Sequence, residues 1–259
     1  VLARLDAHTA GRPGRDGRRG RPAPGPRLRP PAAEPPPGDP PAAAPSALET
    51  LCACFGLTPF ERDVLVLTAA MEVDPTAAHR CAAAAGDPHR PYPTFSLALA
   101  ALREPHWSAL TPVAALRRWL LVEVADGPIT TARLRIDERV LHFLTGVPYL
   151  DPRLHGLVRV VQPPPDLPPS QQRVADALGA CWTAGGPGTP PHAELCGADP
   201  RTRREIAARA AQAAGLTLYL LRAADLPADP GERHLLTRLW EREAILLPAA
   251  LLVEAEDAG

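Results

Sequence analysis

A cluster of prolines at 163–165 and 168–169 divides the chain into two parts with different patterns, and this division constrains the fold most. Before the cluster, short helical patterns precede two strand-like runs. After it, apolar strand-like runs alternate with helical ones. Because proline continues neither a helix nor a central strand, we expect a domain boundary here. The sequence predicts one domain at 47–160, a proline-rich linker at 161–169 and a second domain at 170–259.

The segment before the first domain is predicted to be a disordered tail over residues 1–46. Its stretch Gly11–Pro45 is dominated by Arg, Pro, Gly and Ala. Such a composition cannot bury enough apolar surface to offset the entropy of ordering it. An arginine-rich arm that binds nucleic acid is the alternative. We favour a disordered tail, because no aromatic residue interleaves the arginines to stack on bases.

The first domain is predicted to begin with three or four short helices. A capping-box pattern at Thr58–Glu61 starts one of them, and Pro93-Thr94 starts another. The runs Arg118–Val124 and Ile129–Ile136 are strand-like and flank an Asp-Gly turn, which indicates a hairpin. Asp137 then caps a further helix. Helices followed by a hairpin are the order of a winged helix.

The second domain is predicted to contain a parallel sheet. The expected strands are Ala193–Cys196, Leu216–Leu221 and Ala249–Val253, and helices at 201–214 and 235–244 lie between them. Strands that alternate with helices are typical of a parallel sheet. The sequence ends soon after the last strand, so we expect a truncated sheet.

The turn after the first of these strands resembles a phosphate-binding loop, G-x-x-x-x-G-K-[ST]. Such a loop uses glycines to expose backbone N–H groups, a lysine for the outer phosphates and a hydroxyl for Mg²⁺. Gly197 matches the first glycine, but Thr202, Arg203 and Arg204 replace the second glycine, the lysine and the hydroxyl. Asp199 adds a charge that repels phosphate. The chain has no lysine at all, which also excludes a lysine Schiff base.

The last strand ends in carboxylates, as does the strand that holds Mg²⁺ in P-loop enzymes. Glu254 stands at the position of the magnesium aspartate, and Ala255 at that of the catalytic glutamate. A shifted register offers Glu256 and Asp257 instead, in reversed order. We interpret both motifs as degenerate. The predicted fold class is mixed: an α-rich winged-helix domain followed by a truncated α/β domain with a P-loop-like parallel sheet.

Four segments of the first domain carry a resemblance to a known family: Phe55–Asp63 (FGLTPFERD), Arg90–Leu99 (RPYPTFSLAL), His106–Pro112 (HWSALTP) and Leu134–Leu141 (LRIDERVL). They resemble the N-terminal winged-helix domain of bacterial AAA-family ATPases, including those encoded beside contractile injection systems. Residues 169–257 are similar to the first, degenerate AAA module of that family.

The resemblance implies that the chain is an N-terminal adaptor or interaction region of an ATP-driven remodelling machine. It implies that the chain has protein partners and that it forms homo-oligomers through the AAA modules. It also implies an intact AAA module beyond Gly259 that binds ATP and Mg²⁺. The chain itself would then be inactive, with no catalytic residue of its own.

A DNA-binding winged-helix regulator is the alternative function. The helix at Thr94–Leu102 would then read the DNA, and the turn between Val124 and Ile129 would be the wing. That helix carries no cation before Arg103, and the wing carries Asp126. Because DNA affinity depends on cations that contact phosphates, we favour protein docking or packing within the chain over DNA binding.

Other types of site are not indicated. The five cysteines are an odd number in a long chain, which favours free thiols and a cytoplasmic location. Neither His106 nor His142 has a second ligand at metal spacing, and no serine has a nucleophile-elbow context. No apolar run is long enough to predict a membrane span.

Overall fold

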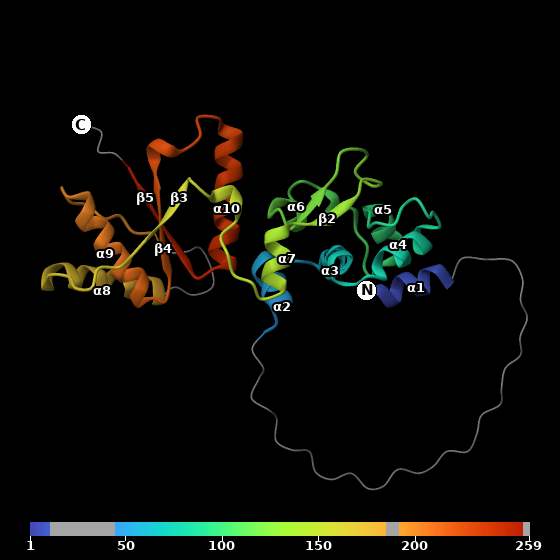
Figure 1. Cartoon of the computed structure of the whole chain (residues 1–259), viewed down its shortest axis with the longest axis horizontal. Coiled ribbons are helices and arrows are strands. Elements are labelled where there is room, and N and C mark those ends of the chain that lie inside the picture. The colour runs from blue at the N-terminus through green and yellow to red at the C-terminus, as the bar shows by residue number, and fades with distance from the viewer. Residues whose placement is uncertain (11–44, 185–191, 256–259) are drawn as a thin grey trace, which may run out of the picture. The chain divides into compact units, whose positions relative to one another are not determined.

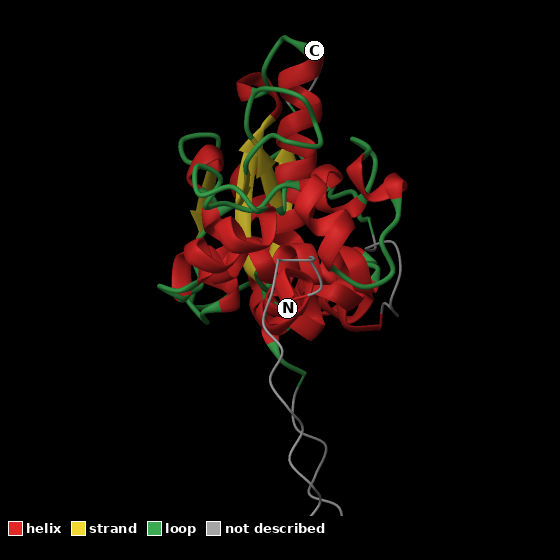
Figure 2. Ribbon diagram, turned by 90° about the vertical axis from the view of Figure 1, so that its right-hand side faces the viewer, coloured by secondary structure: helices red, strands yellow, loops and turns green. Residues whose placement is uncertain are grey.

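The computed structural model describes residues 1–10, 45–184 and 192–255. Within them the chain forms two compact units, and the ribbon combines many helices with two small sheets (Figures 1 and 2). The first unit comprises Val1–Arg117 and Val122–Ile136. The second comprises Arg118–Leu121 and the residues from Asp137 onwards.

The first unit is built from helices around α3. Its elements are α1 (Leu2–Ala10), α2 (Ala47–Phe55), α3 (Pro59–Val73), α4 (Ala77–Ala85), α5 (Phe95–Ala101), the 3-10 helix η1 (Trp107–Leu110), α6 (Ala115–Arg118, whose last residue belongs to the second unit), β1 (Val122–Val124) and β2 (Leu134–Ile136). The capping box at the start of α3 is confirmed, because Thr58 and Glu61 bond each other's backbone N–H. Phe60, Val64 and Leu65 are fully buried, so α3 forms the core of this unit.

Helix α1 packs within the first unit through a buried leucine and two ion pairs, one of which joins Asp6 to Arg80 at 3.6 Å. Leu5 is fully buried, and Arg4 pairs with the buried carboxylate of Asp63. A helix of this length is marginal alone, so this packing stabilises it. The expected disordered tail over 1–46 did not include this helix, which a search for local helix signals misses. Residues 11–44 lie outside the described residues.

The predicted hairpin is present, with shorter strands and a longer loop than expected. Strands β1 and β2 pair antiparallel, with Val122 opposite Ile136. Pro128 starts a second turn by accepting the N–H groups of Thr131 and Ala132. The last bond between the two segments joins the N–H of Ala125 to the carbonyl oxygen of Arg133, and the second turn takes the place of strand pairing after it.

The second unit contains a three-stranded mixed sheet. Its elements are α7 (Glu138–Leu144), the 3-10 helix η2 (Pro152–Leu154), β3 (Val158–Val161), α8 (Pro169–Ala184), α9 (Pro200–Ala213), β4 (Thr217–Arg222), the 3-10 helix η3 (Ala223–Asp225), α10 (Pro230–Leu246) and β5 (Ala249–Glu254). The strand order is β3-β4-β5, with β3 antiparallel and β5 parallel to β4. The predicted Asp137 cap is confirmed, since its carboxylate accepts the N–H of Arg139 and Val140 at the start of α7.

The sheet differs from the predicted one in two ways. Ala193–Cys196 forms no strand, and Val158–Val161, which we did not predict, forms β3. Both edges of β4 are already paired, by β3 and β5. A strand at 193–196 would therefore need another partner, and among the described residues it has none.

Helices lie on both faces of this sheet (Figure 1). On one face, Leu218 of β4 packs with the alanine-rich side of α9. On the other, the ring of Tyr219 lies 5.6 Å from that of Trp240 on α10. Helix α8 packs against α9 at Gly179, where an added Cβ would lie 3.3 Å from the carbonyl oxygen of Ala210. This layering places the N-terminus of α9 near the end of β5.

Buried charges hold α10 to the segment that contains α7 and η2. Arg242 is fully buried, with Nη1 3.2 Å from Asp137 Oδ1 and Nη2 paired with Asp151. Arg139 Nε lies 2.9 Å from Glu243 Oε2. No local sequence pattern predicts this cluster, because its members are up to 106 positions apart. It is a structural network, since buried charges need partners to be tolerated.

Candidate functional site

The N-terminus of α9, where a phosphate would bind in a P-loop, is capped by the protein's own carboxylate. Asp199 Oδ1 accepts the N–H of Arg201 at 3.1 Å, and Oδ2 accepts the N–H of Thr202 at 3.1 Å. The hydroxyl of Thr202 also donates to Oδ2 at 2.6 Å. These bonds, that of the hydroxyl first, lower the pKa of Asp199. The carboxylate is therefore ionised at neutral pH and already uses N–H groups that a phosphate would need.

The two charged residues that stand at magnesium-binding positions pair with each other. Arg204 Nε lies 2.8 Å from Glu254 Oε1, and Arg204 Nη2 lies 2.6 Å from Glu254 Oε2. The hydrogen bond from Arg204 is the main cause that lowers the pKa of Glu254. In the same way, Glu254 raises the pKa of Arg204. This two-point pairing is the strong geometry for an arginine and a carboxylate.

The other residues predicted for the nucleotide site, Gly197 and Arg203, do not form a phosphate-binding loop. Arg203 Nη1 donates to the carbonyl oxygen of Gly197, so it closes the loop on itself. No strand precedes Gly197 in the described residues 192–198. Glu256 and Asp257, the second part of the predicted carboxylate motif, lie outside the described residues.

These residues do not fit ATP with Mg²⁺. At the metal position the guanidinium of Arg204 would repel a divalent cation. It also pairs with Glu254, the carboxylate that could hold such a cation. At the phosphate position the carboxylate of Asp199 would repel an anion. The sequence places Arg204 at the hydroxyl position of the phosphate loop and Glu254 at the position of the magnesium aspartate. It did not predict that these two residues pair. Their opposite charges were the signal that could have shown this.

The surface that would read DNA in a winged helix is poor in cations. None of the seven residues of α5 is charged. The nearby arginines have other contacts: Arg90 pairs with Asp87, Arg103 pairs with Asp63, and Arg133 lies 5.7 Å from the centre of the Tyr92 ring. Helix α5 therefore presents no cation to a phosphate backbone.

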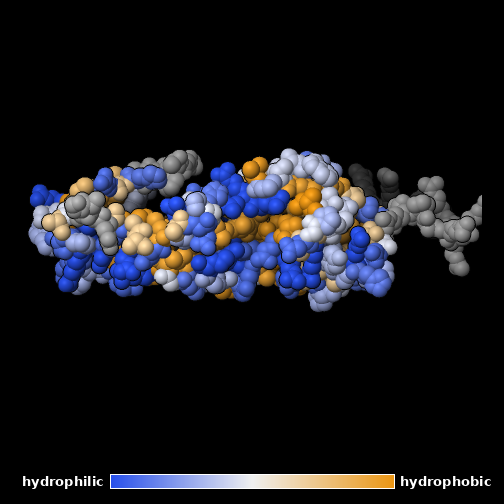
Figure 3. Space-filling view, turned by 90° about the horizontal axis from the view of Figure 1, so that it is seen from above, coloured by the Kyte–Doolittle hydropathy of each residue, from blue (hydrophilic) through white to orange (hydrophobic). Residues whose placement is uncertain are grey.

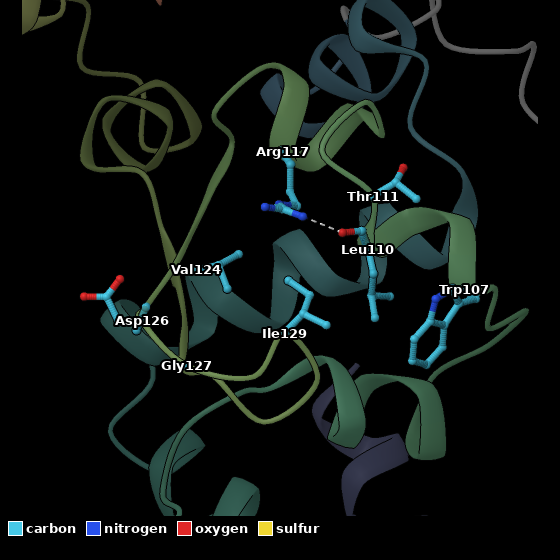
Figure 4. Close-up of a pocket in the computed structure, with 9 residues that line it drawn as sticks. Trp107, Leu110, Thr111, Arg117, Val124, Asp126, Gly127 and Ile129 are labelled. Carbon is cyan, nitrogen blue, oxygen red and sulfur yellow. Dashed lines mark hydrogen bonds between the residues drawn. The ribbon is translucent and has the colours of Figure 1, made fainter.

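An open groove lies on the first unit between η1 and the hairpin loop, and encloses about 520 Å³ (Figure 4). Its lining residues are Trp107, Leu110, Thr111, Arg117, Val124, Ala125, Asp126, Gly127 and Ile129. The guanidinium of Arg117 points into the groove, and its Nη1 donates to the carbonyl oxygen of Leu110 at 2.7 Å. The carboxylate of Asp126 points away from the groove. No local sequence pattern predicts this groove, since its walls come from separate segments, 107–117 and 124–129.

His106 holds the wall of the groove that carries Trp107. Its Nε2 lies 2.9 Å from Thr58 Oγ1 and its Nδ1 lies 2.8 Å from Ser108 Oγ. Its ring packs on the fully buried Phe60, with centroids 5.3 Å apart. The ring of His106 is therefore packed and hydrogen-bonded, and these contacts fix the start of η1.

Trp107 contributes exposed apolar surface beside this groove. It is 63% exposed, the highest exposure of any Phe, Trp or Tyr among the described residues. Its neighbours Ala109 and Leu110 are buried, so the exposure belongs to a packed segment. The space-filling view shows hydrophobic residues exposed on this unit between hydrophilic ones (Figure 3).

Other kinds of site are absent from the part of the chain that the structure describes. No group of three or more His, Cys, Asp or Glu side chains is arranged to hold a metal ion. All five cysteines are free. None of the described helices combines the length and the apolar character that a membrane crossing requires.

Comparison with known proteins identifies the first part of the chain. Residues 42–158 match the family model described as "Winged helix domain, variant". The chain therefore contains a winged-helix domain, as the order of its helices and hairpin predicted. Neither the curated proteins nor the solved structures gave a match. The matched region extends past Ile136, so its last part, with α7 and η2, folds as part of the second unit.

Proposed function

We propose that this chain is the interaction region of an ATP-driven machine of the AAA family. Its winged-helix domain docks a protein partner, and its second unit is a nucleotide fold that supports assembly without binding nucleotide. The pairing of Arg204 with Glu254 carries this proposal, because it joins the two positions between which a P-loop enzyme would hold Mg²⁺.

The pairing supports a structural role because it stabilises the unit without a ligand. A bidentate arginine–carboxylate pair joins the start of α9 to the end of β5. In a working site, nucleotide and metal would make that connection. A unit with this internal substitute keeps its shape in every nucleotide state of the machine.

The winged-helix domain is proposed to bind protein and not DNA. Helix α5 carries no charge, and Arg90 and Arg103 beside it are paired with carboxylates. Affinity for DNA comes largely from cations that displace counterions from phosphates. The groove between η1 and the hairpin loop instead combines apolar side chains with one inward-pointing cation, which suits a protein segment better than a phosphate backbone.

The activity of the whole machine is proposed to reside in a further AAA module beyond Gly259 that binds ATP and Mg²⁺ and forms oligomers. The free thiols fit a reducing compartment, which favours the cytoplasm. Reading the gene downstream of Gly259 tests this link. An intact G-x-x-x-x-G-K-[ST] motif is expected there, and a stop codon without one would remove the link.

Nucleotide binding by the purified chain tests the second unit. A fluorescent ATP analogue with Mg²⁺ is expected to show no saturable binding, and Arg203→Lys is expected to remain silent, because Arg204 and Asp199 still fill the site. A P-loop ATPase measured in parallel serves as the positive control. Saturable micromolar binding to the unmodified chain would overturn the proposal of a filled site.

Duplex DNA tests the choice of partner for the first unit. We expect no more than weak binding, with little difference between about 50 and 200 mM salt. Tight binding that falls steeply with salt would overturn protein docking in favour of a DNA-binding regulator.

A further inference from the structure

We propose that the groove beside Trp107 binds a short segment of a partner protein in which a carboxylate lies next to an apolar side chain. The carboxylate pairs with Arg117, and the apolar side chain packs between Trp107 and Ile129. This inference rests on the proposed protein-docking function, and it names the docking site and the chemistry of the partner.

Arg117 supplies the charge that selects a carboxylate. It is half-buried, and its Nη1 is held by the carbonyl oxygen of Leu110 at 2.7 Å. No carboxylate of the described residues lies within 4 Å of its guanidinium. Asp126, the single acidic residue of the lining, points outward. A fixed guanidinium with an open edge matches a carboxylate in two-point geometry.

The apolar lining supplies the second half of the recognition. Val124 and Ile129 lie on the hairpin side, and Leu110 with Trp107 lies on the other (Figure 4). Exposed tryptophan beside arginine is the combination enriched among residues that dominate binding energy at protein interfaces. Because the partner needs both a charge and an apolar side chain, a chain segment fits better than a small anion.

The groove is already ordered before a partner binds. Both ring nitrogens of His106 are bonded, and they fix η1 and thus Trp107. On the hairpin side, Ala125 donates its N–H to the carbonyl oxygen of Arg133 at 2.9 Å, and Ser96 donates to that of Thr130 at 2.8 Å. Rigid walls reduce the entropy lost on binding. The open shape favours an extended peptide, since enclosed cavities are what small ligands prefer.

Selection from a phage-displayed library of random short peptides, on the whole chain, tests the proposal. The enriched peptides are expected to share Asp or Glu beside an aliphatic or aromatic residue. One of them is then synthesised with a fluorophore, and its Kd is measured by anisotropy. Arg117→Gln is expected to weaken binding by roughly tenfold to a hundredfold, and Trp107→Ala by roughly thirtyfold.

Matched variants separate the groove from general surface effects. Arg135→Gln removes an exposed arginine of β2 that does not line the groove, and Val113→Ala removes an exposed apolar side chain outside it. Both are expected to leave the Kd within about twofold, since surface changes away from a site are nearly neutral. Arg117→Lys keeps the positive charge but loses the planar guanidinium that can donate to a carboxylate at two points, so an intermediate loss of affinity is expected. If Arg117→Gln lowers the melting temperature, its loss of affinity could come from unfolding. The Kd of Trp107→Ala then decides the test, because that variant removes only an exposed side chain.

A double-mutant cycle identifies the carboxylate contact. Replacing the acidic residue of the peptide by its amide should weaken binding to the unmodified chain but cost little more in Arg117→Gln. Three results would overturn the proposal that the groove binds this segment. They are enriched peptides without an acidic residue, equal affinity for Trp107→Ala and the unmodified chain, and no enrichment at all. Peptides that bind elsewhere leave protein docking intact, whereas steeply salt-dependent DNA binding without any peptide binding would overturn the proposed function as well.

Discussion

Arg139 and Glu243, 104 residues apart in the sequence, form a fully buried ion pair with Nε 2.9 Å from Oε2. The guanidinium of Arg139 also lies 5.2 Å from the centre of the Tyr149 ring. Two of its nitrogens and Glu243 Oε1 have no hydrogen-bond partner. Glu243 is the only carboxylate among the described residues that pairs with Arg139, so removing Glu243 leaves a buried guanidinium without a counter-charge.

We predict that Glu243→Ala destabilises the second unit by roughly 3 to 5 kcal/mol, because it leaves Arg139 buried without a counter-charge. Urea unfolding followed by circular dichroism measures the change. Glu241→Ala, at an exposed glutamate of the same helix, is the control, with an expected change within about 0.5 kcal/mol. Equal midpoints for the two variants would contradict the prediction.

A second prediction concerns the pH dependence of the Arg204–Glu254 pair. Arg204 lowers the pKa of Glu254 below its ordinary value of 4.5, so the pair stabilises the fold above about pH 4.5, and this contribution is lost as pH falls through the lowered pKa. Because Arg204 is 33% exposed, Arg204→Gln should cost about 1 kcal/mol or less at pH 7.

The test compares the unfolding free energies of the two proteins at neutral pH and below pH 4. Their difference is expected to shrink at the lower pH, where Glu254 becomes protonated. Arg201→Gln is the matched control, since Arg201 pairs with Glu205 on the exposed side of the same helix. A difference that stays constant with pH would show that Arg204 acts through packing and not through charge.

The cysteines are predicted to differ in their reaction with iodoacetamide. Burial raises the pKa of Cys81 to about 11, whereas Cys54, Cys181 and Cys196 are exposed. The thiolate is the reactive form, so Cys81 should be alkylated last in the native chain at mildly alkaline pH. Peptide mass spectrometry over time measures each rate. In concentrated guanidinium chloride all the rates should converge, and equal native rates for Cys81 and Cys54 would contradict the burial.

Local signals predicted much of this fold. The Thr58 and Asp137 caps depend on contacts within three residues, and the structure confirms both. The strands predicted at Leu216–Leu221 and Ala249–Val253 are also present, as Thr217–Arg222 and Ala249–Glu254, because continuous apolar runs indicate strands. Such features depend on the residues themselves, so the sequence suffices.

Features that depend on distant partners were missed. The strand β3 pairs with β4, and Ala193–Cys196 pairs with no strand of the described residues. In the same way, Arg204 and Glu254 were identified as altered positions, but their pairing depends on the packing of α9 against β5. Local patterns in a single sequence do not predict which distant residues are in contact.

The end of the winged-helix match gives the last prediction. The match ends at residue 158, yet Val158 starts the strand that pairs with Leu221. Leu154 is fully buried against Leu236 and Leu239, and Arg242 holds Asp151. A chain cut after residue 158 loses all these partners. We predict that 137–158 then exchanges its backbone hydrogens much faster than in the whole chain.

Hydrogen exchange measured by mass spectrometry on both chains tests this, and 47–117 within the first unit serves as the internal control. Protection of the control region should be unchanged, because its core contacts lie within the first unit. Exposed Leu154 should also increase the binding of an apolar dye. If 137–158 kept its full protection in the shortened chain, its order would come from the winged-helix sequence alone, and the second unit would not be needed to fold it.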